Sequence, residues 1–206
     1  MSIVERKLLD LLYRTAEGRP DKLPWHRDEP NRLLVALTKT AQPPGRALDI
    51  GCGSGAFADY LAARGFDVIA IDLHPDAVAM ARARSAASQT PFTVLHEDVL
   101  DYAPNEPFDL ILDSGCLHNM NRAGMRAYRT RLIESWLHPG AAYVLEHWTK
   151  RHPLDWRPLG PRRRAGLATF FAPELELVES YSEDMRVPLP LGPRVRGTAY
   201  HFRRAA

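Results

Sequence analysis

The stretch of this chain with the clearest chemistry is residues 47–55, which read Ala-Leu-Asp-Ile-Gly-Cys-Gly-Ser-Gly. An apolar run leads into an acidic residue, Asp49, and then into three glycines, Gly51, Gly53 and Gly55. Glycine lets the backbone approach a ligand closely and adopt a positive φ. N–H groups at the start of a following helix can then face the ligand. The pattern predicts a nucleotide-type cofactor loop between a strand and a helix.

A second acidic residue follows about twenty residues later, where Asp72 ends the apolar run 67–72. Dinucleotide enzymes place a ribose-binding carboxylate at this offset. Gly51, Gly53 and Ala56 also satisfy the dinucleotide fingerprint Gly-x-Gly-x-x-Gly/Ala. An NAD-dependent dehydrogenase is therefore one alternative for this chain.

Three features favour a different cofactor. Asp49 lies two residues before the first glycine, where a dinucleotide strand is normally apolar, and its carboxylate suits an ammonium group better than a pyrophosphate. The third glycine is Gly55, which makes the motif Gly-x-Gly-x-Gly. About 45 residues, including a loop with Trp25, precede the first strand, whereas a dinucleotide fold commonly starts near the N-terminus.

Apolar runs and helical spacings alternate from residue 46 onward, after two helices predicted at 2–17 and 31–40. Because the early strands are almost continuously apolar, they should be buried on both faces of a sheet. We expect an α/β fold with a doubly wound, mostly parallel seven-stranded sheet and an antiparallel edge. Strands are predicted at 46–50, 67–72, 92–96, 108–113, 141–146, 175–181 and 197–202. Helices are predicted at 55–64, 75–87, 122–136 and 162–170, with a turn at 138–140 and an irregular insert at 149–161.

Length and composition narrow the class of protein. The 206 residues suit one domain. In it we expect N-terminal helices and the Trp25 loop at 1–45, a cofactor-binding core at 46–147, and a substrate-side insert with the last strands at 148–206. The net charge of +2 argues against a nucleic-acid partner. No apolar run has the length of a membrane span, no signal peptide is recognisable, and two cysteines make no disulfide framework. We therefore expect a cytoplasmic protein that does not bind a membrane.

Several motifs in order resemble the class I S-adenosyl-L-methionine (SAM)-dependent methyltransferases. They are 48–55, 71–72, Glu-Asp-Val at 97–99, Phe-Asp-Leu-Ile-Leu-Asp at 108–113 and Leu-His-Pro-Gly at 137–140. The resemblance covers roughly residues 24–204 and implies a Rossmann-like methyltransferase fold with SAM as the cofactor.

The resemblance assigns roles to the residues that match these motifs. Gly51, Gly53 and Gly55 should pass the methionine part of SAM, with Asp49 near its amino group. Asp72 should accept hydrogen bonds from both ribose hydroxyls, since one carboxylate can take two donors.

On the adenine side, Asp98 should receive the amino group, with the N–H of Val99 and the side chain of Leu73 at the ring. Asp113 should lie beside the methionine part and the substrate entrance. The alternative for Asp49, Asp72 and Asp98 is turn or helix-cap chemistry, but three aspartates at strand ends of one sheet favour a ligand site.

Three segments resemble a narrower group, the small thiopurine/thiol- and tellurite-type methyltransferases. Pro24-Trp25-x4-Pro30 resembles their Pro-Trp-Asp loop, which folds over the cofactor, although His26 replaces the Asp. Residues 113–118 (Asp-Ser-Gly-Cys-Leu-His) resemble their segment after the fourth strand, and Gly-Pro-Arg-Arg at 160–163 a run before their last helix. Trp25 is then expected at the cofactor, unless it is a plain core anchor.

Methyl transfer needs an aligned nucleophile, exclusion of water, and loss of a proton from an OH, NH or neutral thiol. We expect His118 and His147 as catalytic residues, because histidine titrates near neutral pH and both follow predicted strand ends. Together with His26, Trp148 and Arg162, they should contact the substrate. The alternative interpretations are structural: His118 would be a loop or helix-cap residue, and Arg162 would lie at a solvated helix start. A thiolate or halide would need no base. No zinc-like spacing is present, so no metal is expected.

The sequence thus predicts a SAM-dependent methyltransferase that acts on a small-molecule nucleophile through S, N or O. Other SAM chemistry, such as intramolecular cyclisation or aminocarboxypropyl transfer, is an alternative. SAM binding without catalysis and the NAD-dependent dehydrogenase are remoter ones. The methyl acceptor and the oligomeric state stay open.

Overall fold

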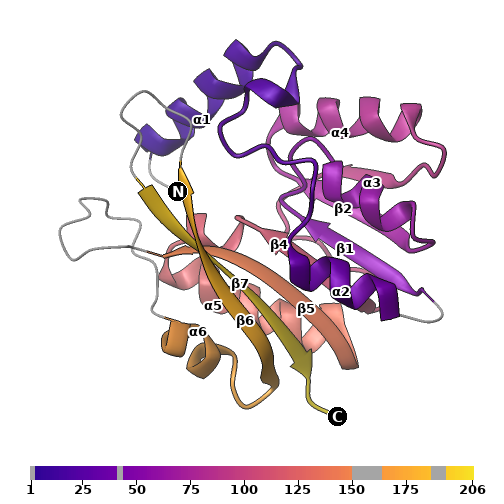
Figure 1. Ribbon diagram of the computed structural model, residues 1–206, viewed down its shortest axis with the longest axis vertical. Helices are drawn as coiled ribbons and strands as arrows, with labels where there is room; N and C mark the ends of the chain where they lie inside the picture. Colours follow the sequence, from indigo (N-terminus) through magenta and orange to yellow (C-terminus); the bar gives the residue numbers. More distant parts are fainter. Residues whose placement is uncertain (1–2, 41–43, 150–163, 187–193) are drawn as a thin grey trace.

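The computed structural model describes residues 3–40, 44–149, 164–186 and 194–206 (Figure 1). The helices are α1 (Ile3–Ala16), α2 (Arg32–Thr40), α3 (Ala56–Ala62), α4 (Pro75–Ala87), α5 (Arg122–Arg131) and α6 (Arg164–Phe171). The strands are β1 (Arg46–Ile50), β2 (Asp67–Asp72), β3 (Thr93–His96), β4 (Phe108–Ser114), β5 (Leu137–Thr149), β6 (Leu175–Arg186) and β7 (Arg194–Arg204).

The seven strands form one sheet in the order β3-β2-β1-β4-β5-β7-β6. β3, β2, β1, β4 and β5 are parallel, whereas β7 pairs antiparallel with both β5 and β6. The predicted doubly wound sheet with an antiparallel edge is thus confirmed. The chain reverses its direction of winding between β1 and β4, and ligands of such sheets bind at the carboxyl ends of the strands at that point.

Helices cover both faces of the sheet. One face packs on α5, its π-helical extension and α6, through side chains that include Tyr128, Trp136 and Phe171. The other face packs on α2, α3 and α4, where Leu34 and Leu61 are fully buried. Since the inner strands β2, β1, β4 and β5 bury apolar residues on both faces of the sheet, they form a middle layer that holds its carboxyl edge in place.

The first helix is an addition outside these layers. α1 packs against α4 (Figure 1), where Tyr13 and Ala16 form a small cluster with Ala77, Met80 and Leu23. α1 thereby presents Tyr13 to the edge of the sheet at which β1 and β2 end. Within the described ranges, no helix is both long and apolar enough to cross a membrane.

The structure corrects several predicted boundaries. The turn expected at 138–140 lies inside β5, which pairs Leu137 with Phe108 and resumes regular pairing at Ala142 after an irregularity. Gly140 has φ of 85°, which lets the strand continue through this irregularity without a reversal. Strands β6 and β7 are also longer than predicted. The insert expected at 149–161 lies outside the described residues except for Thr149, which ends β5.

Candidate active site

The glycine loop follows β1 directly, and its three glycines all have positive φ, at 67°, 55° and 76° for Gly51, Gly53 and Gly55. A Cβ on Gly55 would lie 3.1 Å from Phe92, so this glycine allows close packing. A Cβ on Gly53 would meet only the Tyr13 hydroxyl, at 3.9 Å. Gly53 therefore leaves room for a ligand on the side where protein atoms are sparse.

Asp72 lies next to this loop, as the sequence predicts. Its two carboxylate oxygens accept hydrogen bonds from the N–H of Gly53 at 2.9 Å and the N–H of His74 at 2.8 Å. Burial raises the pKa of the Asp72 carboxyl, and these N–H groups oppose that rise. The carboxylate is thus fixed at the end of β2, beside the loop, where a ribose-binding acid is expected.

Asp49 lies beneath the loop and is only 2% exposed. The N–H of Ala58 donates a hydrogen bond to the Asp49 carboxylate, while Oδ2 of Asp49 has no hydrogen-bond partner among the described residues. Burial, followed by the charges of Asp72 and Asp113, raises the pKa of Asp49 to about 7. Three carboxyl groups at one edge create a negative potential, which fits a cationic cofactor such as SAM and disfavours a pyrophosphate. Direct contact of Asp49 with the amino group of SAM stays a prediction.

Replacement of Asp49 by asparagine should therefore stabilise the fold at pH 8, by roughly 1–3 kcal/mol, and should weaken SAM binding. The raised pKa means that wild-type stability is full below the ordinary pKa of 3.8 and is lost as the pH rises toward 7. The gain should vanish at pH 4. Urea unfolding at pH 4 and pH 8 measures this, with the exposed Asp101→Asn as control. Equal effects at both pH values would contradict it.

Two aromatic side chains at this site have no local sequence pattern that predicts them there. The ring of His74 stacks on that of Tyr13 with centroids 4.1 Å apart, and its Nε2 lies 3.1 Å from Oδ1 of Asp10 in α1. The ring of Trp25 packs edge to face with the same Tyr13 ring, with centroids 5.6 Å apart. Trp25 therefore lies one aromatic layer from the glycine loop, and its predicted contact with the cofactor stays a prediction.

The predicted adenine-side residues follow the ends of β2 and β3. Asp98 Oδ1 accepts the N–H of Leu100 at 2.9 Å, which is turn chemistry. Val99 is buried, whereas Leu73 is 55% exposed, one of few large apolar side chains so exposed in the described chain. An exposed leucine beside two strand ends fits a face on which a ring could lie.

Asp113 is fully buried and organises the loop after β4. Its carboxylate accepts hydrogen bonds from the N–H groups of Gly115, Cys116 and Leu117, and from the hydroxyl of Tyr128 at 2.9 Å. Burial raises the pKa of Asp113 to about 6. The residue thus holds the loop in place, and its predicted contact with the cofactor stays untested.

The structure brings the two predicted catalytic histidines together. The rings of His118 and His147 meet edge to face with centroids 5.6 Å apart. Burial, with His147 as the second cause, lowers the pKa of His118 to about 3. His118 is therefore neutral at physiological pH and a weak base. Trp148 lies in β5, where its backbone pairs with Gly197; its side chain and the whole of Arg162 lie outside what the structure describes.

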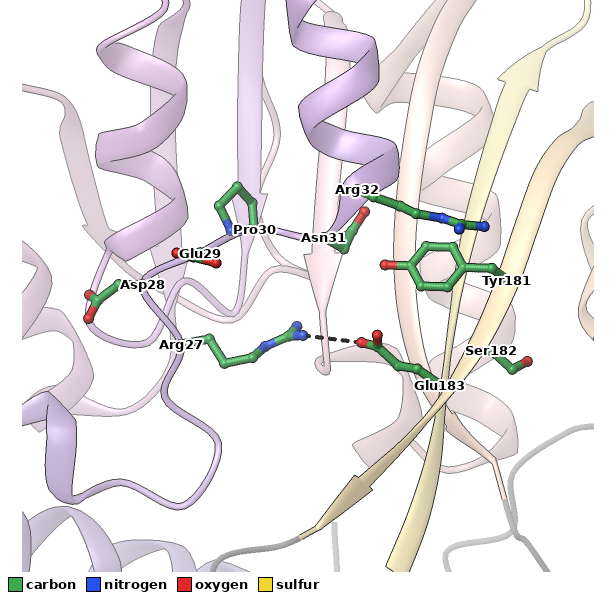
Figure 2. Close-up of a pocket in the computed structure, with 9 residues that line it drawn as sticks. All are labelled: Arg27, Asp28, Glu29, Pro30, Asn31, Arg32, Tyr181, Ser182 and Glu183. Atoms are coloured by element: carbon green, nitrogen blue, oxygen red, sulfur yellow. Dashed lines mark ion pairs between the residues drawn. The ribbon is translucent and has the colours of Figure 1, made fainter.

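Residues 23–30, which we call the lid loop, run over the carboxyl edge between α1 and α2 (Figure 1). His26 Nδ1 lies 3.3 Å from Ser54 Oγ of the glycine loop, and its Nε2 lies 3.2 Å from Asp28. His26, predicted to contact substrate, thus lies against the cofactor loop. Arg27, which sequence reasoning missed, forms an ion pair with Glu146 near the end of β5. Residues 27–32 and 181–183 line a groove of about 690 Å³ (Figure 2).

Comparison with known proteins identifies the family. A family model described as "Methyltransferase domain" matches residues 47–140. The ubiquinone biosynthesis O-methyltransferase of Xanthomonas campestris pv. campestris is 33% identical over 132 residues, which cover 63% of this chain and 53% of that protein. The probable thiol methyltransferase 2 of Arabidopsis thaliana is 32% identical over 143 residues, which cover 67% and 60%. The chain thus matches little more than half the length of these relatives.

A solved structure concerned with the conversion of a disulfide bond into a thioacetal group during echinomycin biosynthesis has the same fold over most of its length. It matches with a TM-score of 0.72 and 28% identity, and the match covers 92% of this chain and 89% of that chain. The strand order, the glycine loop with its neighbouring carboxyl groups and these similarities lead to one conclusion: the chain belongs to the class I SAM-dependent methyltransferases.

Proposed function

We propose that this protein transfers the methyl group of SAM to a small-molecule nucleophile. The observation that carries the proposal is the set of three carboxyl groups, the buried Asp49 and Asp113 and the partly buried Asp72, around a glycine loop at the carboxyl edge of the sheet. SAM, when bound, supplies an electrophilic methyl group on a sulfonium. Asp72 would hold its ribose, Gly53 would give its methionine part room, and the lid loop would exclude water.

A sulfur nucleophile fits the acceptor side best. The ring of the partly buried His118 lies against that of the buried His147, and desolvation lowers the pKa of His118 to about 3. Such an imidazole is too weak a base to take a proton from a hydroxyl or an amide. A free thiol has a pKa of about 8.5, so a small fraction is already thiolate at neutral pH and transfer to sulfur could depend on positioning without a protein base. One relative is a probable thiol methyltransferase, which agrees with this preference.

Replacement of His118 by glutamine should lower kcat by roughly tenfold and change SAM affinity by less than about twofold. The reason is that the neutral imidazole would position the acceptor rather than the cofactor. Calorimetry gives the SAM affinity and steady-state assays with a thiol give kcat; His138→Gln, at the opposite edge of the sheet, is the control. Equal losses in both quantities would show a structural role instead.

Calorimetry with SAM and NADH, followed by product analysis, tests the proposal. It predicts that SAM binds, that NADH does not, and that S-adenosylhomocysteine forms only when an acceptor is present. Methylthioadenosine from SAM alone would point to cyclisation or aminocarboxypropyl transfer. Tight binding without turnover on thiol, amine and phenol panels would point to a non-catalytic SAM-binding protein, and binding of NADH alone to a dehydrogenase.

We further infer that the chain is one methyltransferase domain that acts in the cytoplasm. The seven described strands, β1 to β7, all belong to one sheet, which supports the single domain. Cys52 and Cys116 are free thiols, as expected in a reducing compartment.

A further inference from the structure

Arg27 is the residue through which the lid loop reaches the sheet. Its guanidinium donates a hydrogen bond to Oε2 of Glu146, and the same oxygen accepts the hydroxyl hydrogen of Ser114. Ser114 and Glu146 are register partners at the ends of β4 and β5. The side chain of Glu146 is 12% exposed and that of Arg27 is 29% exposed, so this pair is partly shielded from water. Ion pairs of this kind are stronger than pairs on an open surface.

The same guanidinium faces a second carboxylate. Its other terminal nitrogen lies 3.8 Å from Oε1 of Glu183 in β6, which is 52% exposed (Figure 2). Glu183 lines the groove, on the side opposite the lid loop. Arg27 therefore lies between a shielded carboxylate at the sheet edge and an exposed one in the groove.

In the structure Arg27 contacts both carboxylates at once, so it could keep one of them while it leaves the other. Removing the guanidinium from Glu146 would leave a shielded carboxylate whose one other donor within the described part of the chain is Ser114, and this is costly. A partner at Glu183 offsets part of that cost, because the guanidinium never loses a carboxylate on its way out. The other contacts of the loop, such as His26 with Ser54, tie any such movement to the glycine loop.

We propose that Arg27 is a positioning residue that latches the lid loop in two settings. When Arg27 pairs with Glu146, the loop is closed over the carboxyl edge. When Arg27 pairs with Glu183 alone, the loop is lifted and the acceptor enters through the groove of about 690 Å³. The acceptor's route rests on the proposed methyl transfer, whereas the latch itself does not.

Hydrogen exchange of the lid-loop amides, measured on the protein without cofactor, tests the latch. Arg27→Met and Glu146→Gln should each speed exchange of residues 25–29 by roughly tenfold, and Arg27→Lys should do so less. Glu183→Gln should leave exchange equal to wild type or slower, because it removes the partner of the open setting. Glu179→Gln, four residues away on β6 and paired with Arg32, is the matched control and should change nothing.

If the lid-loop amides of Arg27→Met exchanged at the wild-type rate, the proposed latch would be overturned. Faster exchange in Glu183→Gln than in wild type would overturn it too, since that result describes a static bridge to both carboxylates. Should Arg27→Met fail to fold, the comparison of Glu146→Gln with Glu183→Gln still decides. A second measurement is the KM for a thiol acceptor, which Glu183→Gln should raise by about threefold or more at unchanged SAM affinity. A protein with this exchange pattern that binds no SAM would refute the proposed function and leave the latch standing.

Discussion

Replacement of Asp72 by alanine should weaken SAM binding by about 1.5–3 kcal/mol, the loss expected when charged hydrogen bonds are removed. Two effects would add. The ribose hydroxyls would lose their acceptor, and the N–H groups of Gly53 and His74 would lose the carboxylate that now fixes the glycine loop.

Calorimetric titration with SAM measures this loss. Asp76→Ala, a nearby acid in the first turn of α4, is the matched control and should keep wild-type affinity. Asp72→Asn separates the two effects, since it keeps an acceptor oxygen for one N–H group while it loses the charge. Unchanged affinity in Asp72→Ala would show that a different acidic residue binds the ribose.

Replacement of Asp113 by alanine should lower the free energy of unfolding by about 3–5 kcal/mol. The side chain is fully buried, and its removal would leave three N–H groups of the loop and the Tyr128 hydroxyl without their acceptor. Because His118 follows this loop directly, activity should fall as well.

Urea unfolding measures the stability of this variant. Asp113→Asn keeps one acceptor oxygen and should lose only about 1–2 kcal/mol, while Asp101→Ala, in an exposed turn, should behave as wild type. A loss below about 1 kcal/mol in Asp113→Ala would mean that the loop after β4 is held by its apolar contacts, such as those of the buried Leu117.

That the glycines, Asp49 and Asp72 lie together at one edge of the sheet was predictable because their pattern is local. A strand, an acid and three glycines lie within residues 47–55, and Asp72 ends the next strand along the chain. Parallel strands bring such residues to one edge of a sheet, so the fold class and the positions of these residues follow from one another. The error at 138–140 has the opposite origin. Pro-Gly is typical of a turn, yet pairing with β4 carries β5 through it.

The remaining contacts were beyond local patterns. Arg27 and Glu146 are 119 residues apart, and nothing near either residue indicates the other. Tyr13 reaches the glycine loop only because α1 packs on α4, which depends on the shape of the whole cluster. His118 and His147 could be placed at one edge from the sequence, but the contact between their rings comes from the adjacent β4 and β5. Burial lowers the pKa of His118 to about 3, which makes this predicted base a weak one.

The most direct test of the central claim is mass spectrometry of the products formed from SAM that carries a deuterated methyl group. The protein would be incubated with this SAM and a panel of thiols, amines and phenols, with Asp72→Ala as the control. We predict S-adenosylhomocysteine and a deuteromethylated acceptor in equal amounts, most readily from a thiol, and far less of both from the variant. Intact SAM with every acceptor, or methylthioadenosine in place of S-adenosylhomocysteine, would contradict the proposed methyl transfer.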